Sequence, residues 1–431
     1  MKTGITLIIM MLFASPWTLQ AQESTQNLSL ERAIAFAIEH NKQLQASQMD
    51  IALYQQKVRE TLAQGLPQIN ASANYATNFG HKMSLMGNEI EMKDQSNATA
   101  SLQQLIFSGQ WLVGVQISKI AQQLTEQQVE LTALDIRESI CNSYYTILIL
   151  ERMKGLLAQN MENMNNIHNH TRNLFKAGVV EETDVDQIRI TVGQLKNSML
   201  SLERNIELSN NLMRIQLGIA PGEKIVLTDK LEAFLNEAKI VQSSLQPFNI
   251  SQNAHFRLVE TQIVLNKKLV DLEKWSFAPT LGGSYSYTYK IIKPALDMSP
   301  NHSAGISLSL PVFTGFQRRA KLQQARIELE KSQINQGLLE DQLNLQNDQL
   351  KFELRNALEN YTLQKENIDV ASRVLANYKR KYELGALSSM EMTQANSNYL
   401  QAENNFNSAV LTLLQAQLNL EKLYNQLPYQ Q

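Results

Sequence analysis

Side chains that could do chemistry are sparse and poorly spaced in this sequence of 431 residues. His168 and His170 stand two positions apart, and on a helix such side chains point away from each other, so we expect no metal site. Cys141 is the only cysteine and cannot form an intrachain disulfide. No glycine-rich phosphate loop and no compelling pairing of a nucleophile with a base stands out. These observations predict a protein that is not an enzyme and that needs no cofactor.

Two acidic residues recur at the same distance from two glycines. Asp184 follows Gly178 by six residues, and Glu391 follows Gly385 by six residues. The two glycines lie 207 positions apart. Because other chain breaks repeat at nearly this offset, the sequence predicts two copies of a unit of about 200 residues, far longer than a solenoid repeat. The predicted repeats are residues 23–220 and 245–431, joined by a linker at 221–244.

Composition and charge restrict the class of protein. Glycine (17) and proline (9) are scarce in 431 residues, which is typical of long helices. The formal net charge of −2 excludes the basic surface that binding to nucleic-acid phosphates requires. We therefore expect no nucleic-acid partner.

The N-terminus has the features of a secretory signal. Lys2 precedes an apolar run over residues 5–13, and the run is followed by Pro16 and by small residues near Ala21. This pattern predicts a signal peptide over residues 1–22 and hence an exported protein. No later segment reaches the roughly 18–20 apolar residues that a membrane-spanning helix requires.

Two long segments without proline carry apolar residues that recur with a period of seven: Gln110–Gly178 and Phe316–Leu384. This heptad repeat is typical of coiled coils, and each segment would be about 100 Å long as a helix. The combined length of two shorter predicted helices is close to that of one long helix, and this holds for two such pairs. Each pair would therefore stack end to end along one long helix. Ser29 and Thr183 suit the N-caps of two of the short helices. The expected pairs are Ser29–Ala63 with Thr183–Leu217, and Leu245–Trp275 with Ser388–Gln426.

Each repeat also contains two segments in which apolar and small polar residues alternate strictly. They predict one β-hairpin at about 67–107 and another at about 279–313. Such alternation is typical of transmembrane β-strands, although a soluble hairpin with one wet face gives the same pattern. The expected beginnings and ends of the hairpins are Pro67, Gly109, Pro279 and Gly315.

The predicted hairpins have a structural consequence. Four strands cannot close a barrel, and an open edge cannot face lipid, so subunits must share one barrel. Three copies would give twelve strands, and the long helices would continue the barrel as a coiled-coil tunnel. The expected fold class is therefore mainly α with a membrane β-barrel, built from a duplicated helix–β-hairpin–long helix–helix repeat in a homotrimer.

Aromatic residues stand where such a barrel would meet the membrane surface. Trp111 and Trp275 flank the predicted strands, and Tyr285, Tyr287 and Tyr289 share the apolar face of one strand. We interpret them as an aromatic belt, with ordinary packing as the alternative.

The whole chain after the signal peptide resembles the TolC-like outer membrane efflux proteins. The resemblance rests on motifs that are weak singly but occur in order and twice. It implies a homotrimeric conduit in the outer membrane of a Gram-negative bacterium, with a periplasmic helical tunnel. Its implied partners are a periplasmic adaptor, an inner-membrane pump of the RND, ABC or MFS type, and outer-membrane lipid. The motifs are Leu28–Ile34, Gly65–Pro67, Phe107–Gly109, Pro311–Gly315, Phe175–Val179 and Tyr382–Ala386.

The resemblance also implies roles for residues near the two glycine breaks. Polar and acidic residues that follow each glycine would close the periplasmic mouth of the tunnel: Asp184, Glu391, Gln187 and Gln394. The turns themselves, Gly178 with Val179 and Gly385 with Ala386, would form the tips that contact the adaptor. Alternatively, Asp184 is an ordinary acid at a helix start, stabilised by the helix dipole.

A trimeric surface adhesin is the alternative function, since it also combines coiled coils with a membrane anchor to which several subunits contribute strands. Adhesins place their membrane strands once, at the C-terminus. In this sequence strands are predicted inside both repeats, and residues 411–424 are predicted to be helical. The pattern therefore favours a conduit.

Overall fold

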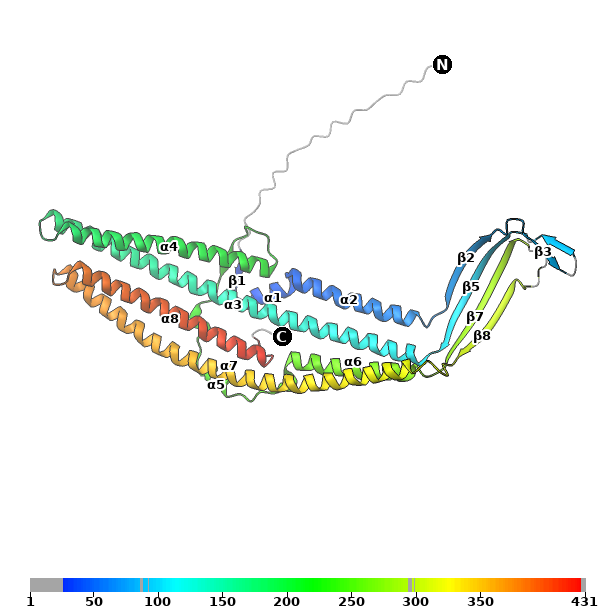
Figure 1. Cartoon of the computed structure of the whole chain (residues 1–431). Helices are drawn as coiled ribbons and strands as arrows, with labels where there is room; N and C mark the ends of the chain where they lie inside the picture. Colours follow the sequence, from blue (N-terminus) through cyan, green and yellow to red (C-terminus); the bar gives the residue numbers. More distant parts are fainter. Residues whose placement is uncertain (1–25, 86–87, 92, 294–296, 298, 428–431) are drawn as a thin grey trace, which may run out of the picture.

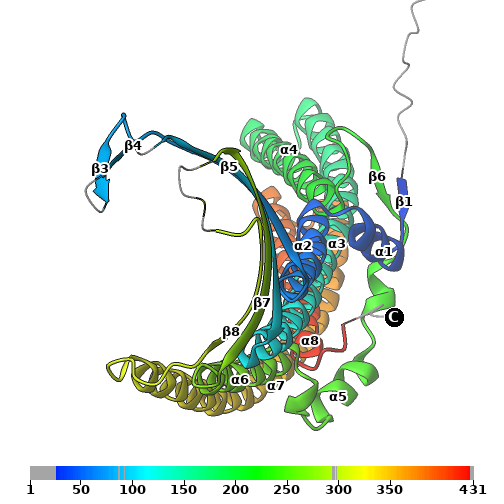
Figure 2. The ribbon, with the colours of Figure 1, turned by 90° about the vertical axis from the view of Figure 1, so that its right-hand side faces the viewer.

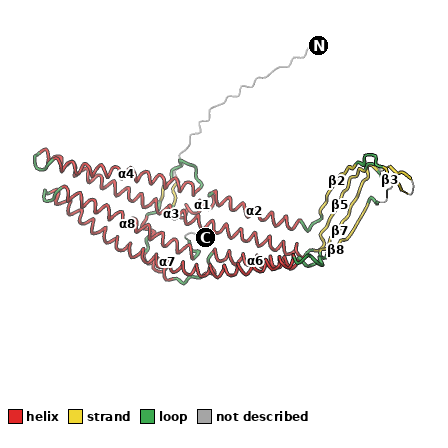
Figure 3. Tube along the Cα trace, in the orientation of Figure 1, coloured by secondary structure: helices red, strands yellow, loops and turns green. Residues whose placement is uncertain are grey.

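The computed structural model describes residues 26–427, except 86–87, 92, 294–296 and 298. The predicted signal peptide, 1–22, lies outside these residues. The described chain forms an elongated body of long helices with a curved β-sheet at one end (Figures 1 and 3). The helices are α1 (Leu30–His40), α2 (Lys42–Ala63), α3 (Gly109–Lys176), α4 (Glu182–Leu217), α5 (Glu237–Leu245), α6 (Ala254–Trp275), α7 (Gln317–Glu383) and α8 (Ser389–Leu423), with short 3₁₀ turns at Leu231–Phe234 and Ile250–Gln252.

Two long helices run the length of the helical body. Helix α3 has 68 residues and α7 has 67, so each is about 100 Å long. α2 and α4 pack against different parts of α3, and α6 and α8 do the same along α7 (Figure 1). The predicted stacking of two short helices along each long one is confirmed.

Some predicted helix boundaries were wrong. The helix expected over Leu245–Trp275 is interrupted, because α5 ends at Leu245 and α6 begins only at Ala254. Pro247 lies between them; proline lacks an N–H, and it disfavours helical backbone in the residue before it. Asn253 then caps α6 by accepting a hydrogen bond from the backbone N–H of Phe256.

The first short helix is also divided, at Asn41. This residue has extended backbone, and its side-chain oxygen accepts hydrogen bonds from the N–H groups of Gln43 and Leu44 at the start of α2. Its amide nitrogen donates to the carbonyl of Gln216, at 2.6 Å. Asn41 therefore ties the α1–α2 break to the end of α4.

Of the two expected N-caps, one is confirmed. Ser29 caps α1 by accepting from the N–H of Arg32. Thr183 is not a cap, because α4 begins one residue earlier, at Glu182, and its N-cap is Glu181. The Thr183 hydroxyl donates to the Glu181 carboxylate instead, at 3.2 Å.

The described strands of the main sheet are ordered β2–β5–β7–β8, and all neighbours are antiparallel. The two predicted hairpins therefore pair with each other through β5 and β7. β2 and β8 form the two edges. The main strands are β2 (Gln68–Ala76), β5 (Gln95–Phe107), β7 (Thr280–Ile292) and β8 (His302–Ser309); β3 (Lys82–Leu85) pairs with β4 (Asn88–Glu91), and β1 (Gln26–Leu28) with β6 (Ile225–Leu227).

The main core lies in the middle of the helical body. There α1, α5 and the ends of α4 and α8 gather around the two long helices. The hydroxyl of buried Tyr144 donates to the carbonyl of Leu28, at 3.0 Å, and lies 2.9 Å from the carboxylate of Asp229. The same carboxylate accepts from the N–H of Leu30. The chain around β1 is thereby fastened to α3.

Candidate functional sites at the helical tips and the sheet

The two glycine turns lie together at the end of the molecule opposite the sheet (Figure 1). Gly178 has φ +74° and Gly385 has φ +71°, a left-handed backbone that a residue with a Cβ adopts only with strain. At the first turn the N–H of Val179 donates to the carbonyl of Leu174; at the second, the N–H of Ala386 donates to that of Lys381. Both turns are exposed, which leaves them accessible to another protein.

Asp184 makes a contact between the two helical hairpins. It is half-buried in the first turn of α4, and its carboxylate accepts a hydrogen bond from the hydroxyl of Ser389, the first residue of α8. Asp184 is therefore both an acid at a helix start and a link to the second hairpin. The sequence did not indicate this link, because the two residues are far apart in the chain.

Glu391, by contrast, acts within its own helix. Its carboxylate accepts from the N–H of Ser388, at 3.0 Å, and from the Ser388 hydroxyl, at 2.8 Å. The Glu391 N–H donates in return to the Ser388 hydroxyl oxygen, which completes a capping box. The bonds from Ser388, that from its backbone N–H first, lower the pKa of Glu391 below its usual value. The spacing Ser-x-x-Glu could have revealed this box from the sequence.

The two predicted glutamines differ in their surroundings. Gln187 is half-buried on α4, and its backbone carbonyl accepts from Thr191. Gln394 is exposed on α8, and its side chain donates to Asn398 on the same helix. Whether these residues and both acids converge at a constriction depends on other copies of the chain. That part of the gate stays a prediction.

A buried hydrogen bond joins α3 to α7, and no local pattern in the sequence indicates it. The hydroxyl groups of Thr171 and Tyr382 lie 2.5 Å apart, within a small core near the tips. Burial is the main cause that raises the pKa of Tyr382, so its hydroxyl stays protonated. Lys379 donates to Asn163 one turn away, at 3.1 Å. Together with the Asp184–Ser389 bond, these contacts tie the two hairpins together near their tips.

Two tryptophans pack against glycines at the junctions between the sheet and the helices. Trp111 lies over Gly65, where α2 leads into β2, and its indole N–H donates to the carbonyl of Thr61, at 2.8 Å. Trp275, at the end of α6, lies over Gly109 at the start of α3. In both cases a Cβ on the glycine would come within 3.0 Å of three ring atoms. These glycines are therefore needed for close packing.

The other predicted boundary residues lie at the same junctions. Pro67 and Pro279 each immediately precede a strand, β2 and β7 respectively. Gly315 has φ +58° and stands two residues before α7. Each boundary residue thus lies where the backbone passes between sheet and helix.

The main sheet presents one apolar and one polar face. Tyr285, Tyr287 and Tyr289 point to the apolar face from β7 and are exposed, at 38–59%. In register with Tyr285 on the two neighbouring strands lie Leu102 and Ala304. On the opposite face polar residues form rows across the strands: Asn70, Ser101, Ser286 and Ser303 in one row, and Ser72, Thr99 and Thr288 in the next.

The described residues contain neither a membrane-spanning helix nor a metal-binding cluster. No helix in the described ranges is both long enough and apolar enough to cross a membrane. Among the same residues, no group of three or more His, Cys, Asp or Glu side chains is placed to hold a metal ion.

Comparison with known proteins identifies relatives across nearly the whole chain. A model of the family described as outer membrane efflux protein matches residues 33–218 and 250–426. Toxin and drug export protein A of Aggregatibacter actinomycetemcomitans is 24% identical over 315 residues, which cover 71% of this chain. The match spans 65% of that relative's length.

Solved structures show the same fold. The CmeC outer membrane channel of Campylobacter jejuni matches with a TM-score of 0.75 at 14% identity, over 93% of this chain and 87% of that one. VceC of Vibrio cholerae matches with 0.72 at 15%, over 93% and 97%. The open state of the MtrE channel of Neisseria gonorrhoeae matches with 0.73 at 14%, over 93% and 90%.

Proposed function

The chain belongs to the outer membrane efflux protein family, and from this premise we propose that it is the outer-membrane exit duct of an efflux or type I secretion system. Its place is the outer membrane, with the helical body in the periplasm. The matched family favours this conduit over the alternative of a surface adhesin.

One observation carries the proposal. The sheet has an apolar and a polar face, and its edge strands β2 and β8 are exposed along their whole length. Sheet and helices follow one arc when the molecule is seen end-on (Figure 2). An unpaired strand edge cannot face lipid, so β2 of one subunit would pair with β8 of the next. Three copies would close a barrel of about twelve strands around a polar interior.

The remaining assignments follow from this arrangement. The chain would consist of two repeats, 23–220 and 245–431, joined by 221–244. Trp111 and Trp275 with the three tyrosines of β7 would lie at the lipid interface. The exposed turns at Gly178–Val179 and Gly385–Ala386 would contact a periplasmic adaptor that connects the duct to an inner-membrane pump. Asp184 and Glu391, with Gln187 and Gln394, would line the periplasmic gate, where a ring of acids favours cations.

The test is single-channel conductance combined with native mass measurement in detergent. We expect three chains per particle and discrete conductance steps after reconstitution into planar bilayers. A stable monomer would contradict the shared barrel, and trimers without conductance under any voltage would contradict the duct. Subunit contacts between β2 and β8 are accessible to disulfide scanning. The native Cys141 should not interfere with such a scan, because it is fully buried and burial raises the pKa of its thiol to about 12.

A further inference from the structure

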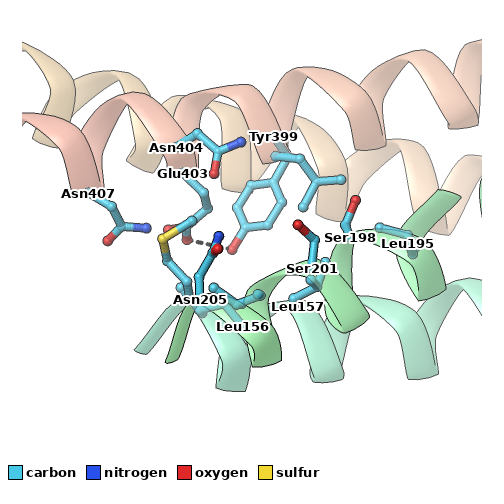
Figure 4. A pocket seen from close by; sticks show the side chains of 13 residues that line it. Leu156, Leu157, Leu195, Ser198, Ser201, Asn205, Tyr399, Glu403, Asn404 and Asn407 are labelled. Carbon is cyan, nitrogen blue, oxygen red and sulfur yellow. Dashed lines mark hydrogen bonds between the residues drawn. The ribbon is translucent and has the colours of Figure 1, made fainter. Parts of the chain in front are cut away.

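A cavity of about 310 Å³ lies between the two helical hairpins, part-way from the core to the tips. Its walls come from α3 and α4 on one side and from α8 on the other (Figure 4). A molecule bound there would touch both hairpins of one chain. The volume falls within the range of small-molecule pockets, which is about 300–1,000 Å³.

Most of the wall is apolar, but one side is polar. Leucines from all three helices line the apolar part: Leu156, Leu157, Leu195, Leu202 and Leu400. Tyr399, Glu403 and Asn407 line the opposite side from consecutive turns of α8 (Figure 4). Among the described residues that line the cavity, Glu403 is the only acidic one and none is basic.

The carboxylate of Glu403 is incompletely satisfied. Glu403 as a whole residue is 7% exposed, and its Oε1 accepts a hydrogen bond from the hydroxyl of Tyr399, at 2.8 Å. Its Oε2 is buried and has no hydrogen-bond partner among the described residues. The guanidinium of nearby Arg152 lies over the ring of Phe406 instead, 5.0 Å from its centroid. A buried carboxylate without a cation is unfavourable unless a positive group reaches it.

Two side chains next to Glu403 add to the evidence that this part of the cavity needs a bound polar or positively charged group. Burial, followed by the bond to Glu403, raises the pKa of Tyr399 to about 12, so the phenol keeps its proton and continues to donate to Oε1. Asn407 is 2% exposed, and neither its amide nitrogen nor its amide oxygen has a hydrogen-bond partner among the described residues. Buried polar atoms of this kind are normally satisfied by a ligand, an ion or water. Three consecutive turns of α8 thus offer polar groups to a bound ligand.

We propose that this cavity is a binding site for a small amphiphilic organic cation, with its charged group at Glu403 and its apolar body among the leucines. The aromatic face of Tyr399 adds attraction for an ammonium group. A divalent metal ion fits less well, because calcium takes six to eight oxygen ligands and the cavity offers a single carboxylate. The site is separate from the tips and the tunnel gate, and it does not rest on the proposed function.

The test is a calorimetric titration of the purified full-length protein with benzyltrimethylammonium. Phenylmethanesulfonate, which has the same benzyl body but a negative charge, is the matched probe. We expect the cation to bind and the anion not to bind. Glu403→Gln, which keeps the shape and removes the charge, should weaken binding of the cation about tenfold or more, because the coulombic attraction between the carboxylate and the quaternary ammonium group is lost.

Two further variants locate the site. Glu203→Gln is the control, since Glu203 lies on α4 next to the cavity-lining Leu202 but is exposed and paired with Lys154, at 3.3 Å. It should bind as the wild type does. Ser201→Phe places a large side chain at a cavity-lining position of α4 while leaving Glu403 in place, and it should abolish binding.

Three outcomes would overturn the proposal. Unchanged affinity in Glu403→Gln would show that the cation binds elsewhere. Equal binding of both probes would show an apolar slot without charge recognition. Binding of calcium or magnesium that depends on Glu403, without binding of benzyltrimethylammonium, would assign the carboxylate to a metal ion. Glu403→Gln removes a buried charge, so it is not expected to prevent folding.

Discussion

The indole ring of Trp275 covers the Cα of Gly109, so closely that a Cβ on Gly109 would come within 3.0 Å of three ring atoms. Trp275 ends α6, and Gly109 begins α3. The ring also makes an edge contact with Phe107 at the end of β5, with 6.4 Å between ring centroids. One side chain of the second repeat therefore positions the point at which the first repeat passes from strand to helix.

Gly109→Ala should weaken this junction, because the new methyl group forces the Trp275 ring out of its place. We expect a loss of about 1–3 kcal/mol, as for other overpacked sites. Gly114→Ala is the control: it lies in the same helix, and its Cβ would meet nothing closer than 4.0 Å. It should be neutral or stabilising, because alanine favours helix. The measurement is thermal unfolding in detergent, and equal unfolding temperatures for the two variants would contradict the packing role of Gly109.

Gly178→Val and Gly385→Val should each distort one tip, because a left-handed backbone costs a residue with a Cβ about 1–2 kcal/mol. The sheet is about 100 Å away, so insertion into the membrane should remain intact. Binding of the adaptor and pump function should be lost. Gly193→Ala, in the interior of α4 with open space around it, is the control. Adaptor crosslinking measures the effect, and labelling of a cysteine at Val179 from outside intact cells would show that the orientation is wrong.

Asp184→Asn should loosen the contact between the hairpins by weakening the hydrogen bond from Ser389. A hydrogen bond to a charged group contributes about 1.5–3 kcal/mol and one between neutral groups about 0.5–1.5 kcal/mol, so a loss of about 1 kcal/mol or more should raise the open fraction of the channel severalfold. Asp186→Asn is the control, since Asp186 pairs with Arg189 on its own helix, at 3.1 Å. Planar-bilayer recordings measure the open fraction. If Asp184→Asn and Asp186→Asn behave alike, Asp184 is an ordinary acid at a helix start.

Thr171→Val and Tyr382→Phe should each weaken the tip core, because each leaves the other hydroxyl buried without this partner. The expected loss is about 1–3 kcal/mol for a single variant. The double variant should lose less than the sum, since both polar groups are then removed. Hydrogen exchange of the tip helices measures the effect. Additive losses would show that the two hydroxyls, although 2.5 Å apart, are not coupled.

The capping box of α8 should make the second tip sensitive to acid. The bonds from Ser388 lower the pKa of Glu391 below its usual 4.5, so the ionised form stabilises the folded helix start. This contribution is complete above the unfolded pKa and is lost as the pH falls through the lowered folded value. The difference in tip hydrogen exchange between wild type and Glu391→Gln should therefore vanish in acid. A difference that persists below the lowered pKa would contradict this account.

The sequence by itself determined the local features of this protein. Strict alternation located the strands, and the long proline-free segments and the glycines at 178 and 385 located the helices and their turns. Such signals act over one or two turns of helix or a few residues of strand, so they can be read without knowing the fold. Pro247 is a local signal of the same kind, and it accounts for the interruption of the helix predicted over Leu245–Trp275.

Only the tertiary structure decided which of these elements meet. The pairing of β5 with β7, the Trp275–Gly109 contact and the Asp184–Ser389 bond join residues some 165 to 205 positions apart. Alternation places a side chain on a face of a strand, but it does not select the partner strand. The cavity at Glu403 likewise depends on the spacing of three helices. These features arise from packing between distant segments, for which a single sequence carries no local signal.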